Sequence, residues 1–256
     1  MSLAGRVALV TGGGRGIGRA ISLSLARDGA AVAVNYRRDL DAANATVAAI
    51  EAAGGRAKAY AASVDSFEQD QAMVEAVLAD FGYIDILINN AGIASRGQSV
   101  VDTDPAEMER VVRTLAFGPH YLCKLVLPSM RTRPRGDVIM ISSVATTLLA
   151  GNGGPYNMGK AAMEALAMTL FKEERRNNVH VNIVAPGLVE TDMGVRLARA
   201  TRGTGDMREL DASAPFGRVC QPQDVADVVS YFVSEQASYL TGQRVGVDGG
   251  GNAGNY

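Results

Sequence analysis

The sequence predicts an α/β fold: a single Rossmann-type, doubly wound parallel sheet of seven strands with helices on both faces. Short β-branched segments alternate with longer helical segments, and a glycine-rich turn follows the first of the short ones. The apolar fraction of 47% provides enough material for a sizeable core. At 256 residues the chain fits one domain, which we expect to span residues 1–256.

Seven segments have the composition of strands. Parallel strands covered on both faces read as nearly continuous apolar runs, and residues 84–88 and 138–141 come close to this pattern. The expected strands are 6–11, 31–35, 58–61, 84–89, 137–142, 180–185 and 244–247.

Helical segments lie between these strands, at residues 17–28, 40–53, 67–81 and 105–130. The last has a capping-box start, with Asp104 followed by Pro105 at the first helical position and then Glu107. The segment 188–215 is irregular and rich in Arg, Gly and Thr. Long structureless connections are usually functional lids or disordered, and we expect this one to be a substrate lid.

Charge and cysteine content argue against several classes of protein. The 25 basic and 27 acidic residues give a net charge of −2, whereas nucleic-acid-binding domains normally have a strong basic excess. Cys123 and Cys220 are far apart and form neither a disulfide framework nor a metal-ligand spacing. Neither a signal peptide nor an apolar run of the roughly 18 residues needed to span a bilayer is evident. We expect a cytoplasmic location, with no metal, membrane or nucleic-acid partner.

A phosphate-binding turn is expected directly after the first strand, where glycines occupy positions 12, 13, 14, 16 and 18. Glycines let the chain turn tightly and approach a pyrophosphate, and the helix that follows offers free N–H groups and the positive end of its dipole. Many strand–helix turns carry one or two glycines, but this spacing in the first unit favours a dinucleotide. The expected contacts are Gly12, Arg15, Gly16, Ile17 and Gly18.

The end of the second strand favours NADP(H) over NAD(H). An acidic residue about 20 positions after the glycines would bind the ribose 2′-hydroxyl of NAD, and Tyr36 occupies this place instead. Arg37 and Arg15 supply guanidinium groups that suit a 2′-phosphate. The alternative, in which Arg37 and Arg38 form a solvated turn, stays open.

Several motifs in order resemble those of the short-chain dehydrogenase/reductase family over essentially the full length of the chain. Within the family, the sequence is most similar to the 3-oxoacyl-carrier-protein reductase branch. The motifs are residues 11–18, Asn89-Asn90-Ala91-Gly92, Ile141-Ser142-Ser143, Tyr156-Asn157-Met158-Gly159-Lys160, residues 181–187, Thr241-Gly242-Gln243 and residues 247–250.

Hydride delivery to a carbonyl leaves an alkoxide, so an acid must supply a proton. Tyr156 and Lys160 are four residues apart, which places both on one face of a helix. The pair alone is common on amphipathic helices. The resemblance implies that Tyr156 is the acid/base and that Lys160 binds the nicotinamide ribose and lowers the tyrosine pKa.

The resemblance also implies an active-site serine. Ser143 lies thirteen residues before Tyr156, the family's usual interval, and would hold the substrate oxygen. Ser142 is its competitor and is interpreted as a strand-end residue. A serine hydrolase is disfavoured because the pattern Gly-x-Ser-x-Gly is absent.

By the same resemblance, further cofactor contacts come from the ends of the later strands. The family usually has an acidic residue for adenine where Ser63 stands, and Asp65 follows two residues later. Asn89 is expected as the contact with the adenosine ribose through the backbone, and the Val189 backbone with Thr191 as the contact with the carboxamide. The full expected set is Ser63, Val64, Asn89, Ala91, Gly92, Pro186, Gly187, Val189 and Thr191.

Leu115 departs from the family pattern. The family normally has an asparagine here that kinks the helix and orders a water leading to the active-site lysine, and leucine can neither donate nor accept. The usual proton relay is therefore in question. A straight, tightly packed helix is the structural alternative, because leucine is the better helix former.

Three functions remain open: reduction of a 3-oxoacyl thioester or related ketone, oxidoreduction of a free steroid, sugar or polyol, and a non-catalytic NADP-binding module. Arg133, Arg135 and Lys172 lie near positions where carrier-protein reductases present basic groups to an acyl carrier protein, although a solvated basic loop and helix end is the favoured explanation. By family analogy we expect a homotetramer, with one interface formed by helix 105–130 and the helix of Tyr156.

Overall fold

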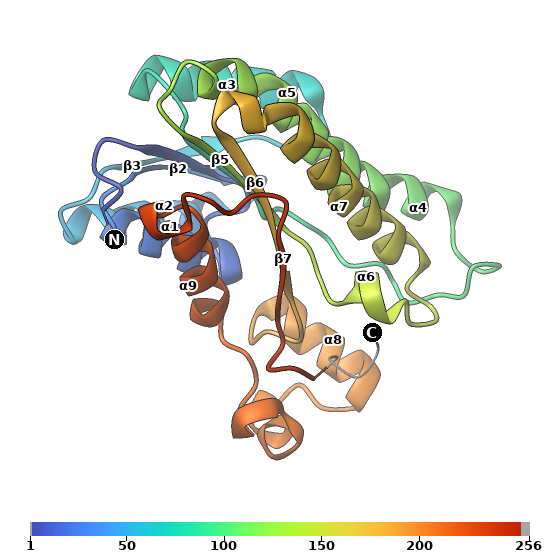
Figure 1. Ribbon diagram of the computed structural model, residues 1–256. Coiled ribbons are helices and arrows are strands. Elements are labelled where there is room, and N and C mark those ends of the chain that lie inside the picture. Colours follow the sequence, from blue (N-terminus) through green and yellow to red (C-terminus); the bar gives the residue numbers. More distant parts are fainter. Residues whose placement is uncertain (1, 252–256) are drawn as a thin grey trace.

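The protein is described by a computed structural model that covers residues 2–251, so Met1 and residues 252–256 of the expected domain lie outside the described residues. Its centre is a parallel sheet with the strand order β3-β2-β1-β4-β5-β6-β7 (Figure 1). This order confirms the expected fold class. The strands are β1 (Val7–Val10), β2 (Ala31–Tyr36), β3 (Ala57–Ala61), β4 (Ile86–Asn89), β5 (Gly136–Ile141), β6 (Val179–Pro186) and β7 (Arg244–Val247).

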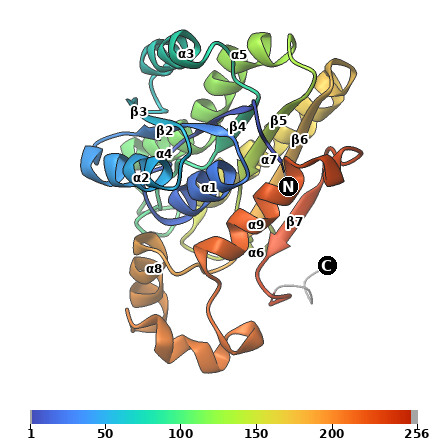
Figure 2. The same ribbon diagram turned by 90° about the vertical axis from the view of Figure 1, so that its left-hand side faces the viewer.

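Helices cover both faces of the sheet (Figures 1 and 2). Successive strand residues point to opposite faces, so Leu9 joins one core and Val10 the other. Because both faces are apolar, each needs its own helical layer. One layer contains α1 (Gly16–Arg27), α2 (Leu40–Ala52) and α9 (Pro222–Phe232); the other contains α3 (Phe67–Phe81), α5 (Gly118–Met130) and α7 (Gly154–Glu174).

The expected continuous helix 105–130 is interrupted. Its start is as expected, since the side chain of Asp104 accepts a hydrogen bond from the backbone N–H of Ala106 at 2.9 Å. Glu107 does not close the capping box; it is buried and accepts from the backbone N–H of Arg96 at 2.5 Å. The three consecutive segments are α4 (Pro105–Val112), a π-helical turn η1 (Arg113–Phe117) and α5.

Packing against the β3–α3 turn accompanies this interruption. A Cβ atom on Gly118, the first residue of α5, would lie 2.4 Å from the carbonyl oxygen of Val64. The backbone of α5 therefore passes too close to this turn for any other residue. Leu115 lies within the π-helical turn, so the prediction that leucine straightens the helix is wrong.

The expected irregular segment 188–215 is largely helical. It contains α8 (Asp192–Arg202) and the short helices η3 (Met207–Ser213) and η4 (Pro215–Gly217). Thr191 begins α8 by accepting a hydrogen bond from the backbone N–H of Gly194 at 3.0 Å. Three buried side chains of the segment, Ala198, Met207 and Leu210, form a small core together with Val219, which follows the segment. The remaining short elements are α6 (Ala145–Leu148), η2 (Arg175–Asn177) and η5 (Glu235–Ala237).

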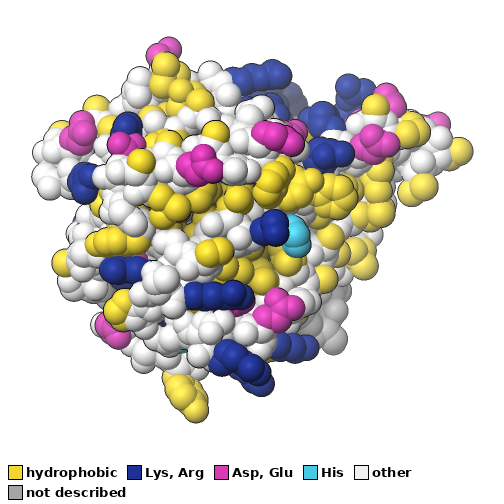
Figure 3. Space-filling model, turned by 90° about the horizontal axis from the view of Figure 1, so that it is seen from above, with side chains coloured by type: hydrophobic (Ala, Val, Ile, Leu, Met, Phe, Trp, Pro, Cys, Tyr) yellow, Lys and Arg dark blue, Asp and Glu magenta, His cyan; other side chains and the backbone are white. Residues whose placement is uncertain are grey.

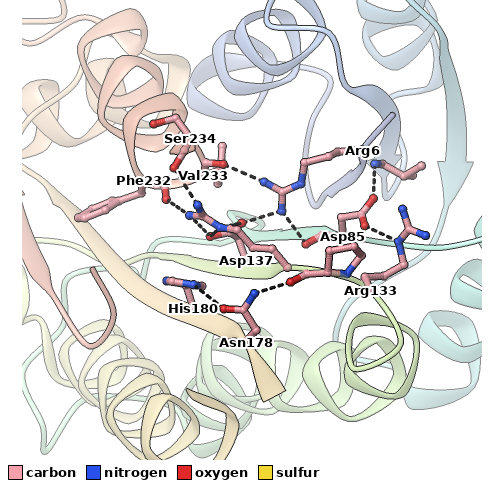
Figure 4. A network of polar contacts seen from close by, with 12 residues as sticks. Arg6, Asp85, Arg133, Asp137, Asn178, His180, Phe232, Val233 and Ser234 are labelled. Carbon is pink, nitrogen blue, oxygen red and sulfur yellow. Dashed lines mark hydrogen bonds and ion pairs between the residues drawn. The ribbon is translucent and has the colours of Figure 1, made fainter. Parts of the chain in front are cut away.

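A buried ion-pair network occupies the amino-terminal edge of the sheet (Figure 4). Asp137 is fully buried and pairs with Arg6 at 2.6 Å and Arg135 at 2.9 Å. Burial raises the pKa of Asp137, and the two guanidinium groups oppose this shift. Arg133 pairs with Asp85 at 2.7 Å. Arg133 and Arg135 thus face inward; they form neither a solvated loop nor a free basic surface.

None of the helices in the described part of the chain is long and apolar enough to cross a membrane. Within residues 2–251 there is also no group of three or more His, Cys, Asp or Glu side chains arranged to hold a metal ion.

Candidate active site

The expected site residues converge on the carboxyl-terminal edge of the sheet. All seven strands are parallel, so the segments that follow them emerge on one side. Chain connections run in opposite directions from β1 and β4, which are neighbours in the sheet, and such a switch point is where open α/β sheets bind ligands. The segments brought together are 12–18, 36–37, 63–64, 89–92, Ser143 and 186–191.

The glycine turn has the geometry of a phosphate cradle. Gly12 and Gly16 have φ angles of +59° and +53°, which side chains rarely adopt. A Cβ atom on Gly18 would lie 2.1 Å from the carbonyl oxygen of Gly12. Helix α1 starts at Gly16, and its N-cap residue, Arg15, makes no side-chain capping hydrogen bond. The first amides of α1 therefore have no side-chain cap, and this arrangement fits a diphosphate.

Thr11 and Asn90, two polar residues without an expected role, hold this cradle in place. The hydroxyl oxygen of Thr11 accepts from the backbone N–H groups of Asn90 and Ala91, both at 2.9 Å. The side-chain amide of Asn90 donates to the carbonyl oxygen of Thr11 at 2.7 Å. The turns after β1 and β4 are thus joined. The motif Asn89-Asn90-Ala91-Gly92 indicates that this turn is part of the site, but the pattern alone does not show which of the two asparagines binds the glycine turn.

The side chain of Asn89 points into the core. It is 2% exposed, its amide nitrogen lies 3.7 Å from Sγ of Cys123, and its Oδ1 has no hydrogen-bond partner among the described residues. Only its backbone can face a cofactor. The same holds for Val64 and Val189, whose side chains are buried.

At the expected adenosine end, Tyr36 is half-buried while Arg15 and Arg37 are exposed. No carboxylate stands at the last position of β2. The hydroxyl of Ser63 donates to the carboxylate of Asp65, two residues later, at 2.6 Å.

The structure brings Ser143 and Tyr156 together. Ser143 follows β5, and its hydroxyl lies close enough to the phenol of Tyr156, on α7, to act on the tyrosine pKa. Burial raises the pKa of Tyr156, and Ser143 partly opposes that shift. Ser142, the competing serine, is 4% exposed and donates to Glu164 at 2.6 Å. Its hydroxyl is therefore engaged away from Tyr156.

Lys160 lies one turn after Tyr156 and is buried. Its Nζ donates to the carbonyl oxygen of Ile141 at 2.6 Å and lies 5.9 Å from the centre of the Tyr156 ring. Burial lowers the pKa of Lys160 to about 8, opposed by the negative charge of Glu164. The lowering of the Tyr156 pKa by Lys160 stays a prediction; burial is the largest influence on that pKa and raises it.

The segment after β6 lies at the same edge of the sheet as Ser143 and the glycine turn. The backbone N–H of Val144 donates to the carbonyl oxygen of Pro186 at 3.0 Å, which ties the serine segment to this strand end. The backbone N–H of Gly187 donates to the carbonyl oxygen of Val247 at 3.1 Å. A Cβ atom on Gly16 would lie 3.2 Å from Cγ2 of Thr191, so the first residues of segment 188–215 lie directly beside the glycine turn.

A dinucleotide cradle beside a serine, a tyrosine and a buried lysine defines a nicotinamide-dependent oxidoreductase. The family model described as enoyl-(acyl carrier protein) reductase matches residues 12–252. The 3-oxoacyl-(acyl-carrier-protein) reductase of Thermotoga maritima is 35% identical over 254 residues, covering 98% of this chain and 99% of that protein. Versicolorin reductase 1 of Aspergillus parasiticus is 36% identical over 257 residues, covering 97% of each.

Solved structures support the same family. A 7α-hydroxysteroid dehydrogenase complexed with NADH and 7-oxo glycochenodeoxycholic acid has a TM-score of 0.89 at 32% identity, covering 98% of this chain and 95% of that one. The angucycline C-6 ketoreductase LanV with bound NADP has a TM-score of 0.87 at 32% identity, covering 97% and 96%. The chain belongs to the short-chain dehydrogenase/reductase family, and its similarity to the 3-oxoacyl reductase branch is confirmed.

Proposed function

We propose that this protein is an NADP(H)-dependent reductase that transfers a hydride to the carbonyl carbon of a 3-oxoacyl thioester or a related ketone. The observation that carries the proposal is that Ser143, close enough to Tyr156 to influence its pKa, and the buried Lys160 lie at the edge of the sheet where the phosphate cradle lies. The nicotinamide supplies the hydride when the cofactor is bound. The side chains supply the proton and the binding of the substrate oxygen.

In this mechanism the hydroxyl of Ser143 donates a hydrogen bond to the substrate oxygen, and the phenol of Tyr156 transfers its proton to that oxygen as negative charge develops. Reduction requires the protonated phenol, the form that burial of Tyr156 favours. Lys160 stands beneath this pair as the buried cation that holds the nicotinamide ribose. The second proposed contact of the nicotinamide is Thr191 with the backbone of Val189.

The preference for NADP(H) is supported by charge at the adenosine end. Tyr36 replaces the acid that would bind a ribose 2′-hydroxyl, and the exposed guanidinium groups of Arg15 and Arg37 are free of the core and suit a 2′-phosphate. Neighbouring structures contain either NADH or NADP, so the choice for this chain rests on these three residues.

The substrate class is supported by similarity to a 3-oxoacyl-(acyl-carrier-protein) reductase. A free small molecule is the second candidate, favoured by the inward orientation of Arg133 and Arg135, which leaves only the exposed Lys172 of the three basic residues considered for carrier-protein contact. Cofactor consumption with acetoacetyl thioesters and with a panel of steroid, sugar and polyol ketones tests both. No turnover of any substrate by protein that binds NADPH would instead favour the non-catalytic module.

Two further proposals concern the substrate lid and the oligomeric state. The first is that segment 188–215 closes over the substrate. The carboxylate of Glu190 holds this segment in place, because it pairs with Arg208 and accepts a hydrogen bond from the side-chain amide of Gln221 at 2.6 Å.

The second proposal is a homotetramer that uses the outer face of α5 and α7. Hydrophobic side chains gather on this face (Figure 3), and Phe117, Met158 and Met168 are exposed there. Light scattering on the purified protein tests the oligomeric state.

A further inference from the structure

The carboxylate of Glu164 accepts hydrogen bonds from three side chains in different parts of the chain. It lies on α7, one turn beyond Lys160. Its Oε1 accepts from the hydroxyl of Ser142 at 2.6 Å and from the hydroxyl of Thr146 at 2.9 Å. Nε of Arg244, the first residue of β7, lies 3.1 Å from the same oxygen. The carboxylate thus joins α7, β7 and the segment that follows β5.

Arg244 binds that segment with the other branch of its guanidinium group. Its Nη2 donates to the hydroxyls of Thr146 and Thr147 at 2.9 Å and 3.1 Å, and to the carbonyl oxygen of Ser143 at 3.4 Å. The Arg244 and Glu164 side chains are 21% and 17% exposed, so the pair is largely shielded from water. Shielding strengthens such contacts relative to those of a surface ion pair.

The segment held in this way has little to stabilise it by itself. Helix α6 has four residues, too few to be stable in isolation, and it contains no buried residue. It ends at Leu149, which has a left-handed φ of 47°. The position of Ser143, the residue just before Val144 and α6, therefore depends on contacts from outside the segment.

We propose that Glu164 and Arg244 are positioning residues that fix the segment 142–147 and thereby aim the hydroxyl of Ser143 at Tyr156 and the substrate oxygen. This proposal rests on the proposed roles of Ser143, Tyr156 and Lys160. The competing explanation is an ordinary stabilising ion pair whose loss lowers the melting temperature and leaves the chemistry alone.

The same carboxylate acts on the charge of the lysine. The groups near Lys160 that can carry charge are Tyr156 and Glu164 on its own helix, and Arg244, which faces Glu164 from β7. Burial lowers the pKa of Lys160 to about 8, and Glu164 opposes this shift. Removing the negative charge therefore favours loss of the lysine proton at lower pH.

The first test compares Glu164→Gln with Glu174→Gln. Glu174 is a matched control because it lies on the same helix, is also shielded, and pairs with Arg131 at 2.5 Å. It is eighteen residues beyond Tyr156, about 27 Å along the helix axis. In Glu164→Gln we expect kcat to fall about ten- to a hundredfold, the loss typical of a small misplacement of a catalytic group. The alkaline limb of kcat/KM should move to lower pH by roughly one unit.

A second measurement does not depend on activity. Amide hydrogen exchange, followed by mass spectrometry, should be about tenfold faster over residues 143–149 in Glu164→Gln and unchanged there in Glu174→Gln. Arg244→Lys keeps a cation beside Glu164 but cannot maintain the forked contacts with Thr146 and Thr147. It should therefore show the lower kcat and faster exchange without the shift of the alkaline limb.

Ser143→Ala separates this proposal from the proposed function. If Ser143→Ala keeps wild-type turnover, the assigned serine role is wrong. If Ser143→Ala is inactive while Glu164→Gln and Arg244→Lys lose no more turnover than Glu174→Gln, and exchange over 143–149 is unchanged, the positioning role is overturned and the pair is merely stabilising.

Discussion

Leu115 packs directly on Gly159: a Cβ atom added to Gly159 would lie 2.8 Å from Cβ of Leu115 and 3.0 Å from its Cδ1. Leu115 is fully buried, and its Cδ2 would also lie 3.1 Å from a Cβ on Gly92. The leucine thus fills space left by two glycines, one just before Lys160 and one in the turn after β4. The side chain of Leu115 therefore forms an apolar surface next to Lys160.

Gly159→Ala should destabilise the protein by about 1–3 kcal/mol, because overpacking outweighs the better helix propensity of alanine. Gly154→Ala is the control, since it lies on the same helix and its nearest neighbour would be 3.8 Å from the new Cβ. Denaturant unfolding of both variants measures the difference. Equal stability of the two variants would show that the contact between Leu115 and Gly159 relaxes freely.

Leu115→Asn should lower stability by about 1–3 kcal/mol, because the change leaves an amide without partners in an apolar contact. We expect the turnover number and the solvent isotope effect of the folded enzyme to stay close to wild type. A higher turnover number with a smaller isotope effect would contradict this and show that proton delivery past Leu115 limits the reaction.

NADPH should bind at least about tenfold more tightly than NADH, equivalent to about 1.4 kcal/mol. The reason is the pair of exposed guanidinium groups of Arg15 and Arg37 together with Tyr36 in place of an acid. Tyr36→Asp should move the preference toward NADH, because a carboxylate binds the 2′-hydroxyl and repels the phosphate. Fluorescence titration of both cofactors decides the matter, and equal affinities in the wild type would refute it.

Tyr156→Phe should abolish turnover while NADPH still binds, because phenylalanine keeps the ring and lacks the proton. Lys160→Ala should lose turnover and also weaken cofactor binding, since it removes the proposed ribose contact. Steady-state kinetics and cofactor titration separate the two effects. Retention of more than a few per cent of activity by Tyr156→Phe would mean that another group is the acid.

Asp70 should make the protein less stable as the pH rises. Its carboxyl group is fully buried on α3 without a hydrogen-bond partner among the described residues, and burial raises its pKa from 3.8 to about 8, with a contribution from Asp65. The folded state then binds more protons than the unfolded state between these two values. The contribution of Asp70 to the free energy of unfolding is fully present below pH 3.8 and is lost as the pH rises through about 8.

Asp70→Asn should therefore raise the melting temperature at about pH 9 more than at about pH 5, because it removes the charge that cannot be solvated. Glu75→Gln, an exposed position on the same helix, is the control. Scanning calorimetry across this range gives the comparison. A parallel pH dependence in wild type and Asp70→Asn would mean that Asp70 is paired or hydrated in solution.

The sequence by itself determined the fold class and much of the site. Strand and helix periodicity are local properties, and parallel strands release their following segments at one edge, so the glycine turn could be placed beside the later motifs. The four-residue spacing of Tyr156 and Lys160 fixed their shared helix face. The interval from Ser143 to Tyr156 selected the serine that the structure places against the tyrosine.

Only the tertiary structure decided what depends on contacts between distant residues. Leu115 sits in a π-helical turn just before α5 passes the carbonyl oxygen of Val64, and its side chain packs on Gly92 and Gly159; helix propensity encodes neither contact. Segment 188–215 packs around a small core of its own with Val219. Which asparagine faces the cradle, and how Glu164 meets Arg244, follow from the strand order and from the packing of helices on the sheet. These contacts join residues up to 80 positions apart, beyond the reach of any local pattern.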